Sequence, residues 1–125
     1  MPKKAVLAIG LDPAFVDFSA TPQFTSELVR RYIDAEIERV RALGFDVVSC
    51  LVDRGETAAA TVEAALRSRR FDCVVIGAGL RQPAECLPLF EKVLNQVHAL
   101  APAAKIAFNT TPADTAQAVQ RWIGD

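Results

Sequence analysis

The sequence predicts an α/β fold of three layers, in which helices cover both faces of an open parallel sheet. The chain has 125 residues, enough for one core, so we expect residues 1–125 to form a single domain. Hydrophobic residues make up 51% of the chain and charged residues 23%, a balance that excludes intrinsic disorder. Short continuous apolar runs alternate with segments of helical periodicity, which is typical of a buried parallel sheet.

The first half of the chain carries two strand-then-helix units. Residues 4–10 (KAVLAIG) form an apolar run that ends in glycine, which predicts a strand buried on both faces. Thr25 offers a capping hydroxyl, and apolar residues then recur at helical spacing until Gly44 ends the helix. Residues 46–53 (DVVSCLVD) predict the second strand, and residues 57–69 predict a helix with its N-cap at the first position.

The second half repeats this order twice. Residues 72–77 (DCVVIG) predict the third strand, and a helix follows from about Pro88, a residue well suited to a first helical position. Residues 105–109 (KIAFN) predict the fourth strand. The last helix begins at Thr111, where a hydroxyl cap and a proline are followed by Asp114 near the positive end of the helix dipole.

Only a few sheet topologies can join four strand-then-helix units. Because crossovers between parallel strands are right-handed, we expect the strand order 2-1-3-4, a flavodoxin-like sheet without the usual fifth strand. Residues 105–109 would then form a short edge strand, whose unpaired backbone groups invite a second chain. The sequence therefore leaves open a homodimer or a higher oligomer.

Charge and hydropathy limit the partners and the location. Fourteen Lys and Arg against fifteen Asp and Glu leave a net charge of −1, which favours neither a nucleic acid nor an anionic membrane as partner. The longest apolar runs, such as residues 74–78, are shorter than the ~20 residues of a membrane span. No signal-peptide cleavage pattern follows the first strand, so we expect a cytoplasmic protein.

The three cysteines suit a reducing compartment. Their spacing matches neither a CxxC motif nor a zinc site, and we expect no metal. Cys50 and Cys73 fall in apolar strands and are expected in the core. Cys86 precedes a helix, where the helix dipole could lower its pKa, so a reactive thiol is the alternative to an inert role there, although no phosphatase loop or nearby histidine supports nucleophilic chemistry.

The order of the strands predicts where a site would lie. In open parallel sheets, ligands bind beyond the carboxyl ends of the strands at the point where the strand order reverses, here between the first and third strands. The loops that follow the first, third and fourth strands meet at this edge of the sheet. They carry six candidate ligand-binding residues, namely Asp12, Gly79, Arg81, Asn109, Thr110 and Thr111.

These residue types suit an anionic ligand. Arg81 would pair with its charge, while backbone amides at Gly79 and Thr111 and the Thr110 hydroxyl would complete the anion site. Asp12 is the candidate for a catalytic base or for orienting a polar group. Each has a structural alternative, which is a turn for Asp12, an internal salt bridge for Arg81 and a helix cap for Thr111.

The connection after the first strand is long. Residues 11–22 exceed the usual two to six residues of such loops and carry Phe15 and Phe18, with Phe24 just beyond. These aromatic rings could form a lid over the site, anchor the loop or pack in a subunit interface, and the sequence does not choose among these roles.

Several nucleotide motifs are absent. Residues 77–79 (GAG) supply two of the three glycines of a dinucleotide fingerprint, but they follow the third strand instead of the first. The chain has no GxxxxGK[ST] run, and residues 11–15 (LDPAF) differ from the hydroxyl- and glycine-rich phosphate loop of a flavodoxin. His98, the single histidine, is expected at the rim opposite the site. We therefore expect no cofactor, and the motifs assign no enzyme class.

Three stretches carry a resemblance. VVIGAGLR, LFEKVLNQVHALAPAAKI and FNTTPADTAQAVQRW resemble a group of short, functionally uncharacterised, single-domain flavodoxin-like α/β proteins, from Asp72 onward. The resemblance implies the same fold and domain limits but no particular activity. It directs attention to the two segments that hold Gly79, Arg81, Asn109, Thr110 and Asp114.

Together these observations predict a small cytoplasmic α/β protein that binds an anionic small molecule at the carboxyl-end rim of the sheet. The alternative is a non-catalytic oligomeric or protein-interaction module. A hydrolase that uses Asp12 is a third hypothesis.

Overall fold

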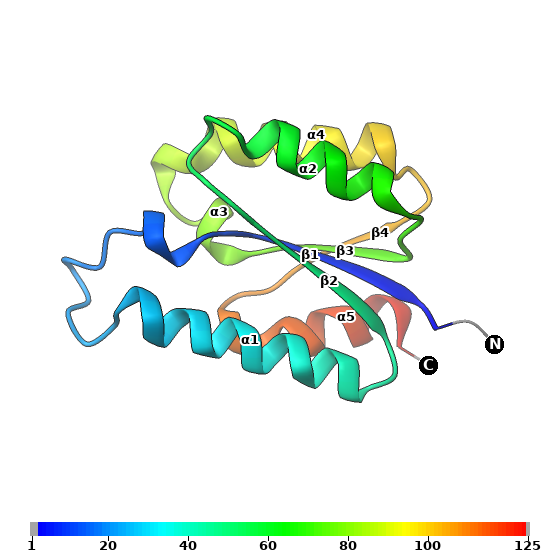
Figure 1. Ribbon diagram of the computed structural model, residues 1–125, viewed down its shortest axis with the longest axis horizontal. Coiled ribbons are helices and arrows are strands. Elements are labelled where there is room, and N and C mark those ends of the chain that lie inside the picture. Colours follow the sequence, from blue (N-terminus) through cyan, green and yellow to red (C-terminus); the bar gives the residue numbers. More distant parts are fainter. Residues whose placement is uncertain (1–2, 125) are drawn as a thin grey trace.

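The computed structural model describes residues 3–124 and confirms the three-layer α/β fold (Figure 1). The terminal residues of the expected domain, 1–2 and 125, lie outside the described residues. All strand pairs are parallel, and the order β2-β1-β3-β4 is the one predicted. The strands are β1 (Ala5–Leu11), β2 (Asp46–Val52), β3 (Cys73–Ile76) and β4 (Lys105–Phe108).

Two pairs of helices cover the sheet. Figure 1 shows one pair on each face. The first pair is α1 (Ser26–Ala42) with α5 (Thr115–Ile123), and the second is α2 (Ala58–Ser68) with α4 (Leu87–Leu100). Within residues 3–124, no helix has both the length and the apolar content needed to cross a bilayer.

Alternate residues of β1 enter two separate cores. Leu7 and Ile9 pack under α2 and α4, whereas Val6 packs with Val40 of α1 and Val119 of α5. A central strand that is buried on both faces needs apolar residues at every position. This is why residues 4–10 read as a continuous apolar run.

The helix ends follow the predicted signals. The Thr25 hydroxyl accepts a hydrogen bond from the Leu28 amide (3.1 Å) at the start of α1. Gly44 follows the helix with φ of +99°, a conformation that a residue with a Cβ rarely adopts. Thr57 precedes α2 as predicted, but its hydroxyl donates to Asp53 and does not cap the helix.

Four short turns accompany these elements. The 3₁₀ turns Pro13–Phe15 and Ala84–Cys86 and the single turn α3 (Ala78–Arg81) were not predicted, because each is too short to show a helical period in the sequence. The 3₁₀ turn Pro112–Asp114 lies where the last helix was expected to begin, so α5 starts at Thr115, later than predicted. Three of the four turns border the carboxyl ends of β1, β3 and β4, so they shape the region where the site was expected.

Candidate functional site

A pocket of about 480 Å³ lies at the predicted position. We call it the rim pocket. It opens between α1 and the carboxyl ends of β1 and β3, and the start of the α5 segment closes one side. Ligand pockets typically measure about 300–1,000 Å³, so the rim pocket has room for a small molecule.

Small residues on the sheet create this space. On the side of β1 that faces α1, the side chains shrink toward the rim, from Val6 to Ala8 to Gly10. Gly77, which follows β3, lies beside the end of β1, and a Cβ there would stand 3.4 Å from the Ile9 carbonyl oxygen and 3.6 Å from the Gly10 Cα. The floor of the pocket is therefore nearly bare backbone.

The walls are mainly apolar. They come from α1, from β2 and from the connection between β1 and α1, and include Val16, Phe18, Phe24, Val29, Ile33 and Leu51. The polar side chains of the lining are all uncharged, namely Thr21, Tyr32, Ser49, Gln82, Asn109, Thr110, Thr111 and Thr115. No Asp, Glu, Lys, Arg or His of residues 3–124 belongs to the lining.

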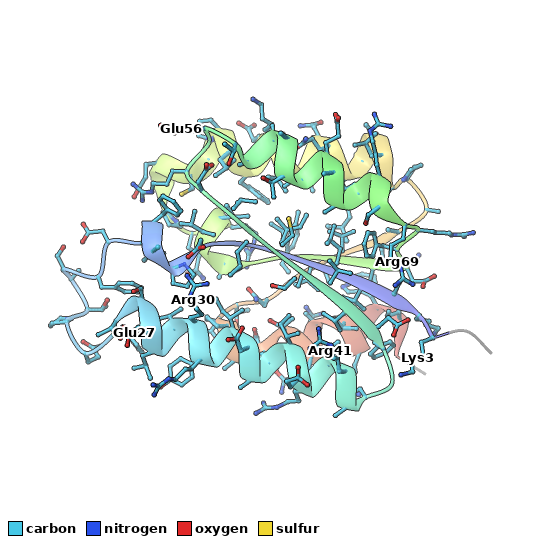
Figure 2. The ribbon with its side chains drawn as sticks, in the orientation of Figure 1. Lys3, Glu27, Arg30, Arg41, Glu56 and Arg69 are labelled. Atoms are coloured by element: carbon cyan, nitrogen blue, oxygen red, sulfur yellow. The ribbon has the colours of Figure 1, made fainter. Side chains whose placement is uncertain are left out.

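Four of the six predicted site residues line the rim pocket, namely Gly79, Asn109, Thr110 and Thr111. Asp12 and Arg81 stand next to it without lining it. The Asp12 carboxylate accepts a hydrogen bond from the Ala14 amide (3.0 Å) and forms an ion pair with Arg30. Figure 2 shows Arg30 reaching from α1 toward the end of β1. Asp12 therefore has the turn role that the sequence left open as an alternative to ligand binding. Its ion pair with Arg30 also joins the connection between β1 and α1 to helix α1.

Arg81 is engaged within the chain. Its guanidinium donates a hydrogen bond to the Asn109 carbonyl and lies 4.9 Å from the centre of the Phe108 ring. Its buried Nε has no hydrogen-bond partner among the described residues. The side chain therefore ties the segment after β3 to the end of β4.

Asn109 joins the two sides of the rim. This side chain is only 8% exposed. Its Oδ1 accepts from the Ala78 amide (2.8 Å), and its Nδ2 donates to the Thr115 hydroxyl (2.9 Å). The amide therefore has partners on both sides, and its position fixes the gap between α3 and α5.

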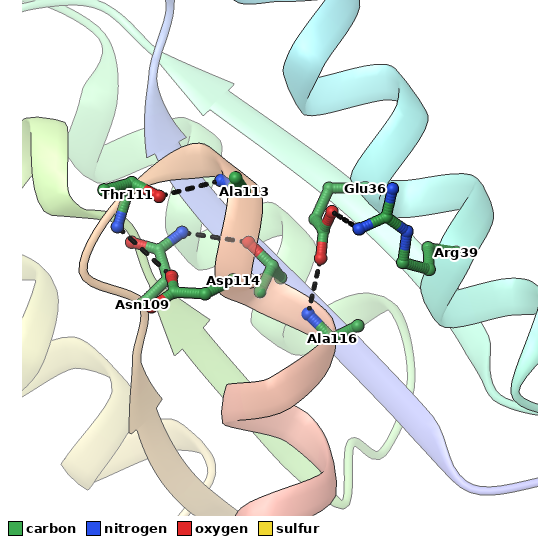
Figure 3. Close-up of polar contacts among 8 residues, drawn as sticks. Glu36, Arg39, Asn109, Thr111, Ala113, Asp114 and Ala116 are labelled. Carbon is green, nitrogen blue, oxygen red and sulfur yellow. Dashed lines mark hydrogen bonds and ion pairs between the residues drawn. The ribbon is translucent and has the colours of Figure 1, made fainter.

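Asp114 occupies the part of the predicted anion site that Thr110 and Thr111 form. One oxygen of the Asp114 carboxylate accepts from the Thr110 amide (2.8 Å) and the Thr111 amide (3.1 Å), and the other accepts from the Thr110 hydroxyl. The Thr111 hydroxyl accepts from the Ala113 amide, which completes a capping box (Figure 3). Burial raises the pKa of the Asp114 carboxyl, but the hydrogen bonds from Thr110 and Thr111 outweigh it, so this pKa lies below its usual value.

Sequence reasoning missed Glu36. This carboxylate on α1 is 3% exposed and accepts a hydrogen bond from the Ala116 amide (3.0 Å) in the first turn of α5 (Figure 3). Its other oxygen lies 3.2 Å from Arg39. The signal was present, because Glu36 falls on the apolar stripe of α1 beside Ile33, where a charge demands a partner. Glu36 therefore links α1 to α5.

The three phenylalanine rings in the connection between β1 and α1 do not all lie at the same place. Phe18 and Phe24 line the rim pocket, whereas Phe15 does not line it and is 44% exposed. Two of the rings therefore lie where a lid would place them. The structure leaves Phe15 available for another contact.

The other candidate groups lie elsewhere. All three cysteines are buried, as expected for Cys50 and Cys73. Burial raises the pKa of the Cys50 thiol, and burial together with the charge of Asp72 raises the pKa of the Cys73 thiol to about 11. His98 is exposed in the last turn of α4. No group of three or more His, Cys, Asp or Glu side chains in residues 3–124 could hold a metal ion.

No protein-family model matches this chain, and no curated protein is similar to it in sequence at a significant level.

Proposed function

We propose that the protein binds a small molecule in the rim pocket. The observation that carries this proposal is the pocket itself, a hollow of about 480 Å³ at the carboxyl-end rim of the sheet. This volume lies within the range of ligand pockets, and a mainly apolar wall with a few polar side chains is typical of small-molecule sites.

The position of the hollow supports the same proposal. It lies where the strand order reverses between β1 and β3, the usual ligand site of open parallel sheets. The long connection between β1 and α1 adds Phe18 and Phe24 to its wall. A ligand that displaces water from this apolar wall gains hydrophobic free energy on binding.

The anionic charge of the ligand, expected from the sequence, stays a prediction. The groups on which it rested already have partners, because Arg81 donates to the Asn109 carbonyl and Asp114 accepts from the Thr110 and Thr111 amides. An anion would have to displace the Asp114 carboxylate to reach these amides. The test of the proposal therefore includes anions beside uncharged compounds.

A thermal-shift screen tests the proposal. The purified protein is heated with phosphate, nucleotides, sugar phosphates, small carboxylic acids and uncharged aromatic and aliphatic compounds. A ligand at 100 times its dissociation constant adds about 2.7 kcal/mol to the free energy of unfolding, which gives a clear shift. We expect at least one compound to raise the melting temperature.

Two variants locate the binding. Ala8→Leu places a larger side chain on the floor of the rim pocket, and Ala64→Leu makes the same change at an exposed position of α2, on the opposite face of the sheet. Ala8→Leu should abolish the shift and Ala64→Leu should preserve it. A screen without any shift, or a shift that survives Ala8→Leu, would contradict the proposal.

A further inference from the structure

We infer that the rim pocket takes an uncharged, mainly apolar small molecule. This inference rests on the proposed function and names the class of its ligand. Three features of the pocket carry it, namely the composition of its wall, the state of the charged groups around it and the unpartnered hydroxyls of its lining.

The wall offers no charge to a ligand. All lining side chains among residues 3–124 are uncharged, and α1, β2 and the connection contribute apolar surface through Ile33, Leu51 and Phe18. A charge that leaves water for such a surface loses its hydration without gaining a partner. An ionised ligand would therefore bind more weakly than an uncharged one of the same shape.

The charged groups next to the pocket already have partners. Asp12 is paired with Arg30, Arg81 lies on the Phe108 ring and donates to a carbonyl, and Asp114 accepts three hydrogen bonds. Recruiting any of these groups to a ligand would break an existing contact. Of these groups only the buried Arg81 Nε lacks a partner, and Arg81 does not line the pocket, so neither an anion nor a cation finds a counter-charge in the lining.

Three hydroxyls remain for a neutral polar group. Thr21, Tyr32 and Ser49 line the pocket, and none of these hydroxyls has a hydrogen-bond partner among the described residues. Thr21 is half-buried, whereas Tyr32 and Ser49 are exposed at the mouth of the pocket. Ser49 is the pairing partner of Ala8 across the β1–β2 ladder, so it stands beside the floor of the pocket. A hydroxyl, ether or amide group of the ligand could bond there while its apolar part fills the hollow.

A matched pair of fluorescent probes tests the inference. N-phenyl-1-naphthylamine is uncharged, and 8-anilino-1-naphthalenesulfonate has the same ring skeleton with one added sulfonate. Each probe is titrated into the wild-type protein and into Ala8→Leu, Ser49→Leu and the Ala64→Leu control. Ser49→Leu fills the pocket from β2 and provides a second test if Ala8→Leu does not fold, which circular dichroism and cooperative thermal unfolding report.

We expect the uncharged probe to bind the wild-type protein at least about tenfold more tightly than the sulfonate, because the sulfonate would lie in the pocket without a counter-charge. The two filling variants should each weaken the uncharged probe by about tenfold or more, since its space is taken. The Ala64→Leu control should leave its affinity unchanged.

The opposite results separate the two claims. Equal or tighter binding of the sulfonate, lost in the filling variants, would overturn the inference and leave the proposed function standing. If neither probe binds the wild-type protein, the inference fails, and the thermal-shift screen decides the proposed function separately. If the probes bind but both filling variants bind them as the wild type does, the rim pocket is not the binding site, and the inference and the proposed function fail together.

Discussion

Arg81 shows how a residue that suits a ligand can serve the fold. A cation in a loop at the carboxyl end of β3 is well placed to hold an anion, and the sequence supports that role. The structure instead brings the Asn109 carbonyl and the Phe108 ring within its reach. Both partners lie at the end of β4 or just after it, far from Arg81 in the sequence. The residues around Arg81 in the sequence therefore could not predict these contacts.

Replacing Arg81 should therefore weaken the fold more than the site. We expect Arg81→Ala to lower the free energy of unfolding by about 1–2 kcal/mol, because it removes a charge-assisted hydrogen bond and a cation–π contact. Binding of N-phenyl-1-naphthylamine should stay close to the wild-type value. Urea unfolding and fluorescence titration measure the two effects, with the exposed Arg70→Ala as control. Lost binding at unchanged stability would instead make Arg81 a ligand contact, as the sequence predicted.

Asp114 should make stability depend on pH. Its pKa is lowered in the folded protein by hydrogen bonds from Thr110 and Thr111 that outweigh burial, so the ionised form stabilises the fold above the ordinary pKa of an aspartate. This contribution is lost as the pH falls below about 4 and the carboxyl takes up a proton. Asp114→Asn should cost about 1 kcal/mol at neutral pH and nothing at low pH.

Chemical unfolding of both proteins between neutral and acidic pH measures this difference. Asp34→Asn, at an exposed position of α1, is the matched control and should follow the wild-type profile. A constant gap between wild type and Asp114→Asn across the whole range would contradict the assigned role of the carboxylate.

Among the elements, α1 and α5 depend on one buried carboxylate. Glu36 lies between these two helices and accepts the Ala116 amide, one of the amides that the first turn of α5 leaves without a helical partner. We expect Glu36→Ala to lower the free energy of unfolding by about 1–3 kcal/mol, because this buried amide loses its acceptor. Glu38→Ala removes an exposed ion pair with Arg41 on the same helix and should cost less than about 1 kcal/mol. Equal losses of unfolding free energy in Glu36→Ala and Glu38→Ala would show that the link between the helices contributes no more than an exposed ion pair.

The long elements could be predicted because their patterns are repetitive. β1 alternates between two apolar cores, and α1 carries its cap and its terminal glycine in the sequence. The turn α3 (Ala78–Arg81) could not be predicted, because four residues show no period. β4 ends at Phe108, one residue earlier than expected, because its pairing with β3 stops at Ile76.

The place of the rim pocket could be predicted, but the partners of its polar groups could not. Strand order placed Gly79, Asn109, Thr110 and Thr111 at the rim, and all four line the pocket. Whether the Thr110 and Thr111 amides are free to bind a ligand depends on the backbone geometry. Asp114 accepts from both amides because the chain forms the turn Pro112–Asp114. The hollow arises from Ala8 and Gly10 facing α1, a contact between distant segments.

At the scale of the whole molecule, both open edges of the sheet carry a guanidinium. Arg41 donates to the Val47 carbonyl on β2 (3.4 Å), and Arg121 donates to the Phe108 carbonyl on β4 (3.2 Å). A second chain that added a strand to either edge would have to displace these contacts. The oligomer suggested by the sequence stays a prediction, which light scattering of the purified protein tests.

The rim pocket also costs the molecule stability. Its apolar wall contacts water when no ligand is bound, so a side chain that covers this wall should stabilise the empty protein. We expect Ala8→Leu to raise the free energy of unfolding by about 0.5–2 kcal/mol, as cavity-filling changes commonly do. Urea unfolding measures the gain, and Ala64→Leu should change stability by less than about 0.5 kcal/mol. A marked loss of stability in Ala8→Leu would mean that the floor of the rim pocket has no space for the larger side chain, which would contradict this prediction.

The most direct test of the central claim is a methyl NMR titration of the wild-type protein with N-phenyl-1-naphthylamine. Binding in the rim pocket should shift the methyl signals of Ile33 and Leu51, which line it, and leave those of Val62 on α2 and Val93 on α4, at the opposite face of the sheet, unchanged. Shifts centred on Val62 and Val93, or no shifts at a saturating probe concentration, would contradict the claim that this pocket is the binding site.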